Sequence, residues 1–320
     1  MIRKTLGNSG ISVAPLALGG NVFGWTIDEK NSFQVLDAFV DAGFNLIDTA
    51  NMYSAWVPGN QGGESETIIG RWLQSTGKRK QVVLATKVGL PMGDGSRGLK
   101  KEYIFRAVEE SLTRLQTDVI DLYQSHKDDP DVPQEETLSA YDTLIRQGKV
   151  RAIGASNFSP ERLTEALQIS AKNQLPAYCT LQPEYNLYDR KDFEENLEPV
   201  CHQYGLGAIG YYSLARGFLS GKYRSQADLT KSPRGTSIGE HYLNERGDRI
   251  LAALDEIAAA HGARPATVAL AWLIQQRSVA APIVSATSVE QLSEITSAAT
   301  LQLTGDDFQK LNQASAYVSK

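Results

Sequence analysis

The stretch from VVLATKV at residues 82–88 to VIDLYQSH at 119–126 decides the fold. Both runs are short, apolar and rich in β-branched residues, as buried strands are, and the segment between them, 101–116, has an amphipathic helical pattern. A strand, a helix and a second strand in this order predict two parallel strands joined by a crossover helix. The same unit repeats outward in both directions along the chain.

Eight runs are predicted to be strands: 15–20, 44–50, 82–88, 119–126, 150–157, 178–186, 207–214 and 281–286. Helical patterns occupy 31–42, 64–75, 101–116, 135–147, 160–173, 192–204, 248–261, 265–276, 288–299 and 305–316. Eight strand–helix units in 320 residues favour an α/β fold of the (β/α)8 TIM-barrel type, which needs about 250 residues. A doubly wound sheet is the alternative, but no GxGxxG follows the first strand.

Three features complete the predicted organisation. The opening RKTLGNSGISVA has an Asn8-Ser9-Gly10 turn between alternating runs, which predicts an N-terminal β-hairpin capping the bottom of the barrel. No linker or repeat divides the chain, so we expect a single domain over 1–320. The long polar segment 224–247 is either a lid or binding loop, or a disordered excursion.

The composition narrows the function classes. With 42% hydrophobic residues, 22% charged residues and a net charge of −5, the chain is typical of a globular protein and lacks the basic character of nucleic-acid binders. We expect neither a membrane span nor a signal peptide, because no apolar run is long enough and MIRKTLGNSGISV has no apolar core. Two cysteines without CxxC spacing favour a cytoplasmic location, and four histidines without metal-ligand spacing predict no metal site.

Chemically useful side chains stand at the ends of successive predicted strands. Asp48 ends the second strand and Tyr53 follows it, the third delivers Lys87, and His126 ends the fourth. The next strands bring a further polar or aromatic set, namely Ser156, Asn157, Gln182 and Tyr211. Because functional groups of a barrel gather at the carboxyl ends of its strands, we expect one site there.

In these motifs the chain resembles the aldo-keto reductases, NAD(P)H-dependent carbonyl reductases with the (β/α)8 fold. The resemblance covers almost the whole length and rests on NLIDTANMY, GGESETIIG, VVLATKV, DVIDLYQSH, GKVRAIGASNFS, LQPEYN, SLARGFLSGKY and ATSVEQL. It implies a catalytic tetrad of Asp48, Tyr53, Lys87 and His126. Tyr53 would be the general acid, and we expect Lys87 beside it to lower its pKa. Asp48 would hold Lys87, and His126 would donate a hydrogen bond to the substrate carbonyl.

The resemblance also implies a nucleotide site. Ser156, Asn157 and Gln182 would bind the nicotinamide carboxamide, and Tyr211 would stack on the ring, with Tyr212 as the competitor because Tyr-Tyr-Ser-Leu replaces the usual Tyr-Ser-Pro-Leu at 211–214. Gly20 is a further candidate contact of the nucleotide. Other expected nucleotide contacts are Leu214, Arg216 and Lys222 at the pyrophosphate, and Ser285, Thr287, Gln291 and Glu294 at the adenosine end.

The nucleotide preference depends on where a 2′-phosphate would bind. Residues 285–299 contain neither Lys nor Arg, whereas many relatives have a cation there. Lys222, Lys231 or Arg234 would then bind the phosphate, as implied by branches such as the potassium-channel β-subunits. We expect NADP(H) to be favoured, with NAD(H) possible.

The sequence thus predicts an enzyme that reduces small aldehydes or ketones, with Trp25 and Trp56 as walls of an apolar substrate pocket. We expect a monomer whose partner is a small carbonyl compound. A cofactor-binding regulatory module resembling the potassium-channel β-subunits is the alternative, and it would show a broken tetrad or a long partner-binding terminus. A barrel lyase with a Schiff-base Lys87 is disfavoured because Asp48 would keep that lysine charged.

Overall fold

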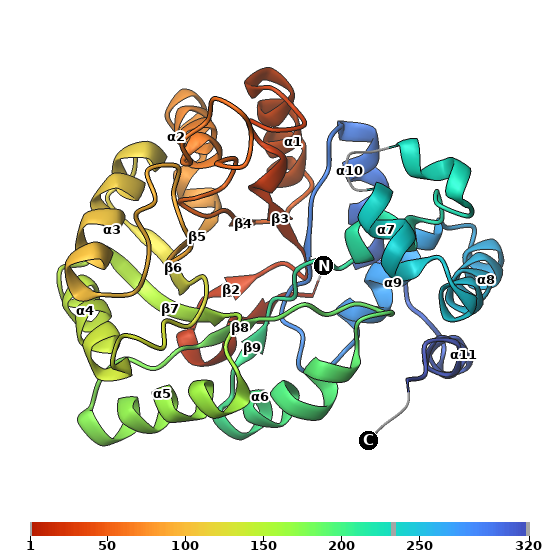
Figure 1. The fold of residues 1–320 in the computed structure, drawn as a ribbon. Helices are drawn as coiled ribbons and strands as arrows, with labels where there is room; N and C mark the ends of the chain where they lie inside the picture. Colours follow the sequence, from red (N-terminus) through yellow and green to blue (C-terminus); the bar gives the residue numbers. More distant parts are fainter. Residues whose placement is uncertain (1, 232–234, 318–320) are drawn as a thin grey trace.

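The computed structural model describes residues 2–231 and 235–317. Its main sheet has eight parallel strands in the order β10-β3-β4-β5-β6-β7-β8-β9, which Figure 1 shows curling round a common axis. The strands are β3 (Ala17–Gly19), β4 (Leu46–Asp48), β5 (Val83–Val88), β6 (Ile120–Ser125), β7 (Val150–Ser156), β8 (Thr180–Gln182), β9 (Gly207–Ala208) and β10 (Ile283–Val284). All eight predicted strands are present, although several are shorter than their apolar runs.

The two edges of this sheet meet and close the barrel. The amide of Ile283 on β10 donates to the carbonyl of Gly210, just past β9, at 2.9 Å. Further down, the amide of Ala280 donates to the carbonyl of Ala208 at 2.8 Å. The (β/α)8 barrel predicted from the strand–helix alternation is therefore confirmed.

Helices surround the strands in chain order (Figure 1). They are α1 (Glu29–Asp41), α2 (Glu64–Thr76), α3 (Lys101–Leu115), α4 (Gln134–Arg146), α5 (Pro160–Asn173), α6 (Glu198–Tyr204), α8 (Glu245–His261), α9 (Pro265–Ile274), α10 (Val289–Thr296) and α11 (Gly305–Ala314). Local signals fix several boundaries: Ser159 caps α5 by accepting from the amide of Arg162, and Pro160 occupies the first turn. The predicted helix 192–204 differs in that its first part, Phe193–Leu197, is a π-helix.

The N-terminal hairpin closes the bottom of the barrel, as predicted. Its strands are β1 (Lys4–Thr5) and β2 (Ser12–Val13), and the turn ends at Gly10 with φ 71°. Leu6, Ile11 and Val13 are buried in one apolar cluster with barrel residues such as Ala17, Leu46 and Leu122. Burial of these side chains pins the hairpin across the amino-terminal ends of the strands, so access to the barrel is from the opposite rim.

The polar segment 224–247 is largely helical in its described part. It contains a 3₁₀ helix, Gln226–Lys231, and α7 (Gly235–Tyr242), while residues 232–234 lie outside the described residues. Tyr242 of α7 is buried and stacks on Phe218 with ring centroids 5.3 Å apart. Arg216, in the loop after β9, also donates to the Ser237 hydroxyl of α7. The described part of this segment is therefore packed on the barrel.

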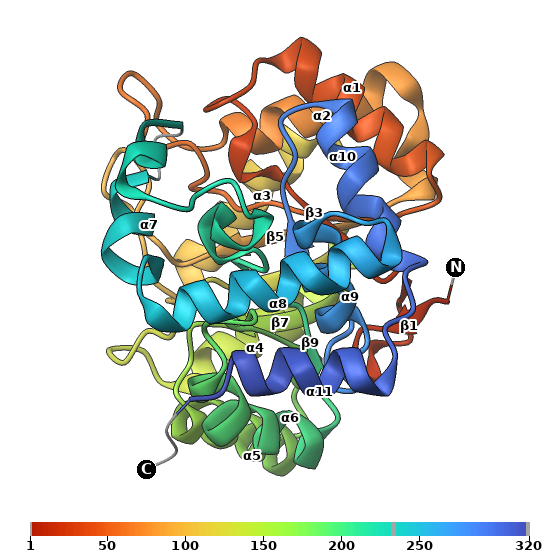
Figure 2. The same ribbon diagram turned by 90° about the vertical axis from the view of Figure 1, so that its right-hand side faces the viewer.

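The last helices cover one flank of the barrel, where Figure 2 shows α11 lying along α8. His261 of α8 and Asp307 of α11 join the two through a 2.9 Å contact. Within the described residues, no single helix has the length and apolar character of a membrane span. Among the described helices, one pair, α8 and α9, passes that test when taken together, and this pair is bent by 94°.

Candidate active site

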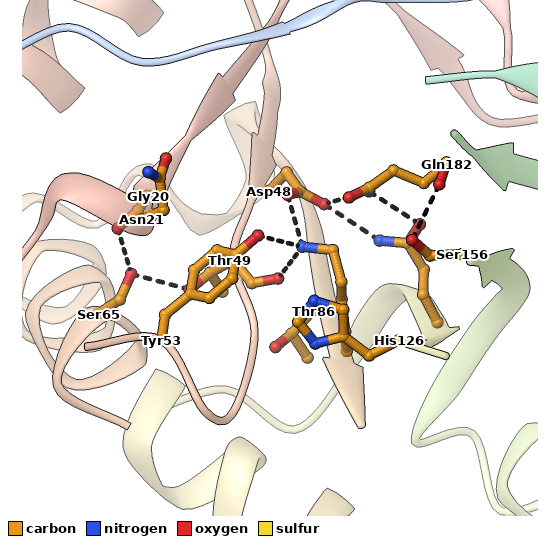
Figure 3. A network of polar contacts seen from close by, with 12 residues as sticks. Gly20, Asn21, Asp48, Thr49, Tyr53, Ser65, Thr86, His126, Ser156 and Gln182 are labelled. Atoms are coloured by element: carbon orange, nitrogen blue, oxygen red, sulfur yellow. Dashed lines mark hydrogen bonds and ion pairs between the residues drawn. The ribbon is translucent and has the colours of Figure 1, made fainter. Parts of the chain in front are cut away.

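The barrel gathers the predicted side chains at its carboxyl rim. Asp48 is the last residue of β4, Lys87 is next to last on β5, and His126 directly follows β6. Neighbouring parallel strands are in register here, with Gly19 opposite Asp48 and Lys87 opposite Gln124. Because the strands end at the same rim, side chains far apart in the sequence meet there, as Figure 3 shows.

Lys87 is the centre of the site and makes three short hydrogen bonds. Its Nζ donates to Oδ2 of Asp48 at 2.7 Å, to the carbonyl of Thr49 at 2.7 Å and to the hydroxyl of Tyr53 at 2.9 Å (Figure 3). The side chains of Lys87 and Asp48 are 0% and 1% exposed, so the charges of this pair are withdrawn from water. All three donor positions of the ammonium group are satisfied, which fixes its orientation toward the phenol.

Electrostatics keep Lys87 charged in this buried position. Burial alone would lower the pKa of Lys87, but the negative charge of Asp48 and the contact with Tyr53 outweigh it and raise the pKa. The ammonium form therefore persists at neutral pH. A charged lysine is a poor nucleophile, which agrees with the expectation that Lys87 does not form a Schiff base.

The pKa of Tyr53 lies above its ordinary value. Burial of the hydroxyl raises this pKa and exceeds the lowering by Lys87, while Asp48 raises it further. Lys87 therefore lowers the pKa of Tyr53, as expected from the sequence, but it does not bring the net pKa below the ordinary value, because burial outweighs it. The pKa is raised overall because the burial that strengthens the contact with Lys87 also disfavours the charged phenolate. At neutral pH the phenol is protonated.

His126 completes the group at the rim. Its ring centroid lies 5.9 Å from that of Tyr53, and the rings are inclined at 71°. Burial, and then the charge of Lys87, hold the pKa of His126 well below its ordinary value, so the imidazole is neutral at neutral pH. Among the described residues, its buried Nδ1 has no hydrogen-bond partner. A neutral imidazole carries one N–H donor and one acceptor, which suits it to hydrogen bonding without proton loss.

Two amides hold the other oxygen of Asp48. Oδ1 accepts from Nε2 of Gln182 at 3.0 Å and from Nε2 of Gln124 at 3.1 Å. Gln182 was a predicted site residue, but Gln124 was not. The sequence did contain a signal for Gln124, because it is a polar residue in a predicted strand whose other inward-facing residues are apolar.

The predicted nicotinamide residues form one connected set beside the tetrad. The Ser156 hydroxyl donates to the carbonyl of Gln182 at 2.9 Å. Asn157, in the left-handed region with φ 54°, donates to the carbonyl of His126 at 2.9 Å and to the Ser156 hydroxyl at 3.1 Å. The Tyr211 hydroxyl donates to Oδ1 of Asn157 at 3.0 Å. Through this contact Tyr211 is connected to the predicted nicotinamide-binding residues, whereas Tyr212 makes no such contact among the described residues.

The loop after β9 carries the predicted pyrophosphate contacts in an unusual backbone. Tyr212, Ala215 and Arg216 all have positive φ, between 48° and 59°. The carbonyl of Leu214 accepts from the amides of Gly217 and Leu219, and Nε of Arg216 is buried without a partner among the described residues. Lys222 is exposed, with its ammonium 5.1 Å from the Tyr223 ring centre. Non-glycine residues with positive φ are uncommon and concentrate at functional sites.

The adenosine-side candidates lie at and after β10. The Ser285 hydroxyl donates to Asn21 at 2.6 Å, and Oε1 of Gln291 accepts from the amide and hydroxyl of Thr287 at 2.8 and 3.1 Å. Glu294 contributes a backbone carbonyl that accepts from the hydroxyls of Thr267 and Ser297.

Gly20 and two alternative cations, Lys231 and Arg234, were further candidates for nucleotide contacts. The carbonyl of Gly20 accepts from Ser65 at 2.7 Å (Figure 3). Lys231 is paired with Asp228 at 2.6 Å and donates to the carbonyl of Lys222 at 3.0 Å. Arg234, the other alternative cation, lies outside the described residues.

Aromatic side chains surround the entrance to the tetrad. Trp56 lies edge-on to Trp25 and to Tyr53, with ring centroids 5.5 and 6.0 Å away, and its side chain is 44% exposed. Tyr212 is 38% exposed, with the Arg216 guanidinium 5.0 Å from its ring centre. Exposed rings beside a polar site form an apolar approach to it. In the described part of the chain, no cluster of His, Cys, Asp or Glu side chains would hold a metal ion.

The site thus joins a half-buried phenol to a buried ammonium–carboxylate pair at the open rim of a (β/α)8 barrel, where barrel enzymes have their active sites. Comparison with known proteins specifies the class. The model of the Aldo/keto reductase family matches residues 15–316, and the chain therefore belongs to the aldo/keto reductases and is an oxidoreductase. Members of this family generally use NAD(P)H.

Similar proteins span bacteria and fungi. An uncharacterized oxidoreductase of Bacillus subtilis strain 168, YrpG, is 37% identical over 96% of this chain and 94% of its own length. The aldo-keto reductase AFTS1 of Alternaria alternata is 33% identical over 98% of this chain and 91% of its own. Protein tas of Escherichia coli strain K12 is 33% identical over 93% of each chain. These relatives are matched along nearly their full length.

Proposed function

We propose that the protein reduces aldehydes or ketones to alcohols with NAD(P)H, and that Tyr53 is the general acid. The observation that carries this proposal is the 2.9 Å hydrogen bond between the Tyr53 hydroxyl and the buried ammonium of Lys87. A positioned acid at this rim is what protonation of a carbonyl oxygen requires. The nicotinamide would supply the hydride, and the protein supplies position and charge.

Tyr53 and Lys87 divide the work of proton transfer. A phenol whose pKa is not below its ordinary value carries its proton at neutral pH, so Tyr53 is ready to protonate the substrate oxygen. Once the proton has left, the ammonium of Lys87 stabilises the phenolate. Asp48 compensates the lysine charge before the reaction, so the pair does not have to form during it. In alcohol oxidation the same phenolate would accept the proton.

His126 would orient the carbonyl without exchanging its proton. Its lowered pKa keeps the ring neutral, and a neutral ring still has one N–H to donate to the substrate oxygen. Because its ring lies beside that of Tyr53, both side chains could hydrogen-bond to the same substrate oxygen. Hydrogen bonds to the oxygen as charge develops there are a large source of rate acceleration.

The chain's residues fit a nicotinamide nucleotide. Gln182 uses its NH2 group on Asp48, while its Oε1 accepts no hydrogen bond within the described residues and would accept one from a carboxamide. Nε of Arg216, which has no partner among the described residues, is suited to an anionic phosphate. We favour NADP(H), with Lys222 near the loop as the cation for the 2′-phosphate, and NAD(H) remains the alternative.

The rim favours substrates with an apolar group next to the carbonyl. Trp25, Trp56 and Tyr212 would contact such a group, and aromatic contacts contribute about 0.5–1.5 kcal/mol each beyond area burial. Aromatic aldehydes are therefore preferred candidates. Both cysteines are free and buried, which suits a reducing compartment such as the cytoplasm, and a monomer stays the expected form.

Nucleotide binding followed by turnover tests the proposal. The purified protein would be titrated with NADPH and NADH, following tryptophan fluorescence, and then mixed with a panel of aldehydes. We expect oxidation of the bound nucleotide by an aromatic aldehyde. Binding without oxidation across the panel would contradict the proposed reaction while leaving the nucleotide site in place.

A further inference from the structure

We propose that Gln124 is a positioning residue for the general acid: its amide fixes the Asp48 carboxylate and thereby aligns Lys87 with Tyr53. This inference rests on the proposed function, since it assigns a role within the same proton-transfer site. Gln124 lies on β6, two residues before His126, and its side chain is fully buried.

Asp48 is held from both of its oxygens. Oδ2 accepts from Lys87 at 2.7 Å, while Oδ1 accepts from the amides of Gln124 at 3.1 Å and Gln182 at 3.0 Å. Nε2 of Gln182 also lies 3.2 Å from Oε1 of Gln124, so the two amides support each other. We call the two amides of Gln124 and Gln182 the carboxylate clamp. This clamp holds the Asp48 carboxylate in one orientation, in which Oδ2 faces the ammonium of Lys87.

The neighbouring strand is shaped to admit this glutamine. Gly154 of β7 lies opposite Gln124 in register and opposite Thr180 of β8. A Cβ at Gly154 would lie 2.3 Å from the Thr180 hydroxyl and 3.0 Å from Cγ of Gln124. The absence of a side chain at this position therefore makes room for Gln124 in the barrel interior. Such interiors are usually filled by branched apolar residues, so a buried amide here needs a polar reason.

The clamp acts on Tyr53 through the negative charge of Asp48. Each amide that donates to Oδ1 compensates part of the negative charge of Asp48, and without Gln124 only the amide of Gln182 remains there. Removing the Gln124 amide would leave more of the negative charge of Asp48 uncompensated near Tyr53. Negative charge disfavours the phenolate, so loss of Gln124 raises the pKa of Tyr53. It also frees Gln182 from one of its two contacts in the site.

The test replaces Gln124 with methionine, which has similar length and no amide. Tyr123→Phe is the matched control on the same strand, because the buried Tyr123 hydroxyl has no hydrogen-bond partner among the described residues. For Gln124→Met we expect an upward shift of the Tyr53 ionisation by about half a pH unit or more. The expected fall in kcat is about tenfold, with nucleotide affinity little changed. Tyr123→Phe should match the wild type in all three.

Gln124→Glu gives the conservative comparison. A glutamate beside Asp48 has a raised pKa because two carboxylates repel each other. While protonated, it can donate to Oδ1 as the amide does, so its kcat relative to wild type should be highest at acidic pH. The kcat of Gln124→Glu should then fall as the pH rises and the new carboxyl ionises.

Two readouts separate failure of this inference from failure of the proposed function. Ultraviolet difference titration of each protein against its Tyr53→Phe counterpart isolates the ionisation of Tyr53 without any turnover. The inference is overturned if Gln124→Met leaves that ionisation unchanged, whether or not its kcat or stability falls. If the wild type reduces no aldehyde, the proposed function fails, and the titration still decides the role of Gln124.

Discussion

The Tyr53 hydroxyl and the Lys87 ammonium lie 2.9 Å apart, and the same ammonium is 4.6 Å from the centre of the Tyr53 ring. Lys87 therefore contacts both the oxygen and the π face of the phenol that we propose as the acid. Either contact favours a cation beside this ring, and the one to the oxygen stabilises the phenolate left by proton transfer.

Removing the Tyr53 hydroxyl tests its chemical role. Tyr53→Phe should lower kcat by at least about 10²- to 10⁴-fold, the usual contribution of a general acid, while nucleotide affinity is kept. Steady-state kinetics and fluorescence titration give the two values. Tyr123→Phe, the same change at a hydroxyl without a partner in the described part of the chain, should keep the wild-type rate. Retention of most of kcat in Tyr53→Phe would assign the proton to another donor.

Removing the charge of Asp48 should destabilise the fold. Asp48→Asn leaves the buried ammonium of Lys87 without a counter-charge, and breaking a buried pair in this way costs about 3–5 kcal/mol. Urea unfolding measures the loss. Glu29→Gln is the control, since it breaks an exposed pair with Arg71 that contributes little. Equal effects of the two changes would contradict the account of the buried pair.

His126 should make stability depend on pH. Because its folded pKa is lowered, the unfolded chain binds more protons between that value and the ordinary pKa near 6.5. Its contribution is therefore full above about pH 6.5 and is lost as the pH falls toward the folded pKa. Thermal unfolding at several pH values should show a weaker acid dependence in His126→Asn. Parallel curves for the two proteins would mean that His126 is not held neutral by the fold.

The aromatic entrance should set substrate preference. Trp56→Ala is expected to raise KM for aromatic aldehydes by about two- to tenfold, following the usual value of an aromatic contact, and to change KM for short aliphatic aldehydes little. Val289→Ala, at another exposed apolar residue, serves as the control. An equal change for both substrate types would show that Trp56 does not contact the substrate.

A cation at position 291 should shift the nucleotide preference. Gln291→Arg would bring a guanidinium to a region, 285–299, that has no Lys or Arg. We expect NADPH to gain roughly tenfold in affinity relative to NADH, a difference of about 1.4 kcal/mol. Gln168→Arg is the control for net charge, because it adds the same charge on α5, which carries none of the predicted nucleotide contacts. An unchanged ratio would place the 2′-phosphate elsewhere.

The barrel and the meeting of Asp48, Tyr53, Lys87 and His126 at one rim were predictable because their signals are local, whereas the catalytic roles of these residues were implied by the family resemblance. Each strand is a short apolar run, and each predicted catalytic residue stands at or just after the end of one, so parallel pairing alone brings them to one rim. The hairpin was predictable for the same reason, since its turn residues are contiguous. The breaks within longer patterns, such as the π-helix at Phe193–Leu197, depend on packing that the spacing of residues does not encode.

What could not be predicted depends on distant contacts. Gln124 gains its role from a partner 76 positions away and from the space left by Gly154. The direction of the Tyr53 pKa depends on whether burial or Lys87 is stronger, and only the three-dimensional surroundings decide that balance. The described part of 224–247 is ordered by packing of Tyr242 on Phe218, which no local pattern indicates.

The most direct test of the central claim is a single-turnover experiment. Protein saturated with NADPH is mixed with 4-nitrobenzaldehyde, and the nicotinamide absorbance is followed for the wild type and Tyr53→Phe. The account predicts rapid loss of the absorbance in the wild type and almost none in Tyr53→Phe, with equal nucleotide binding in both. Equal rates in the two proteins would contradict the assignment of Tyr53 as the acid.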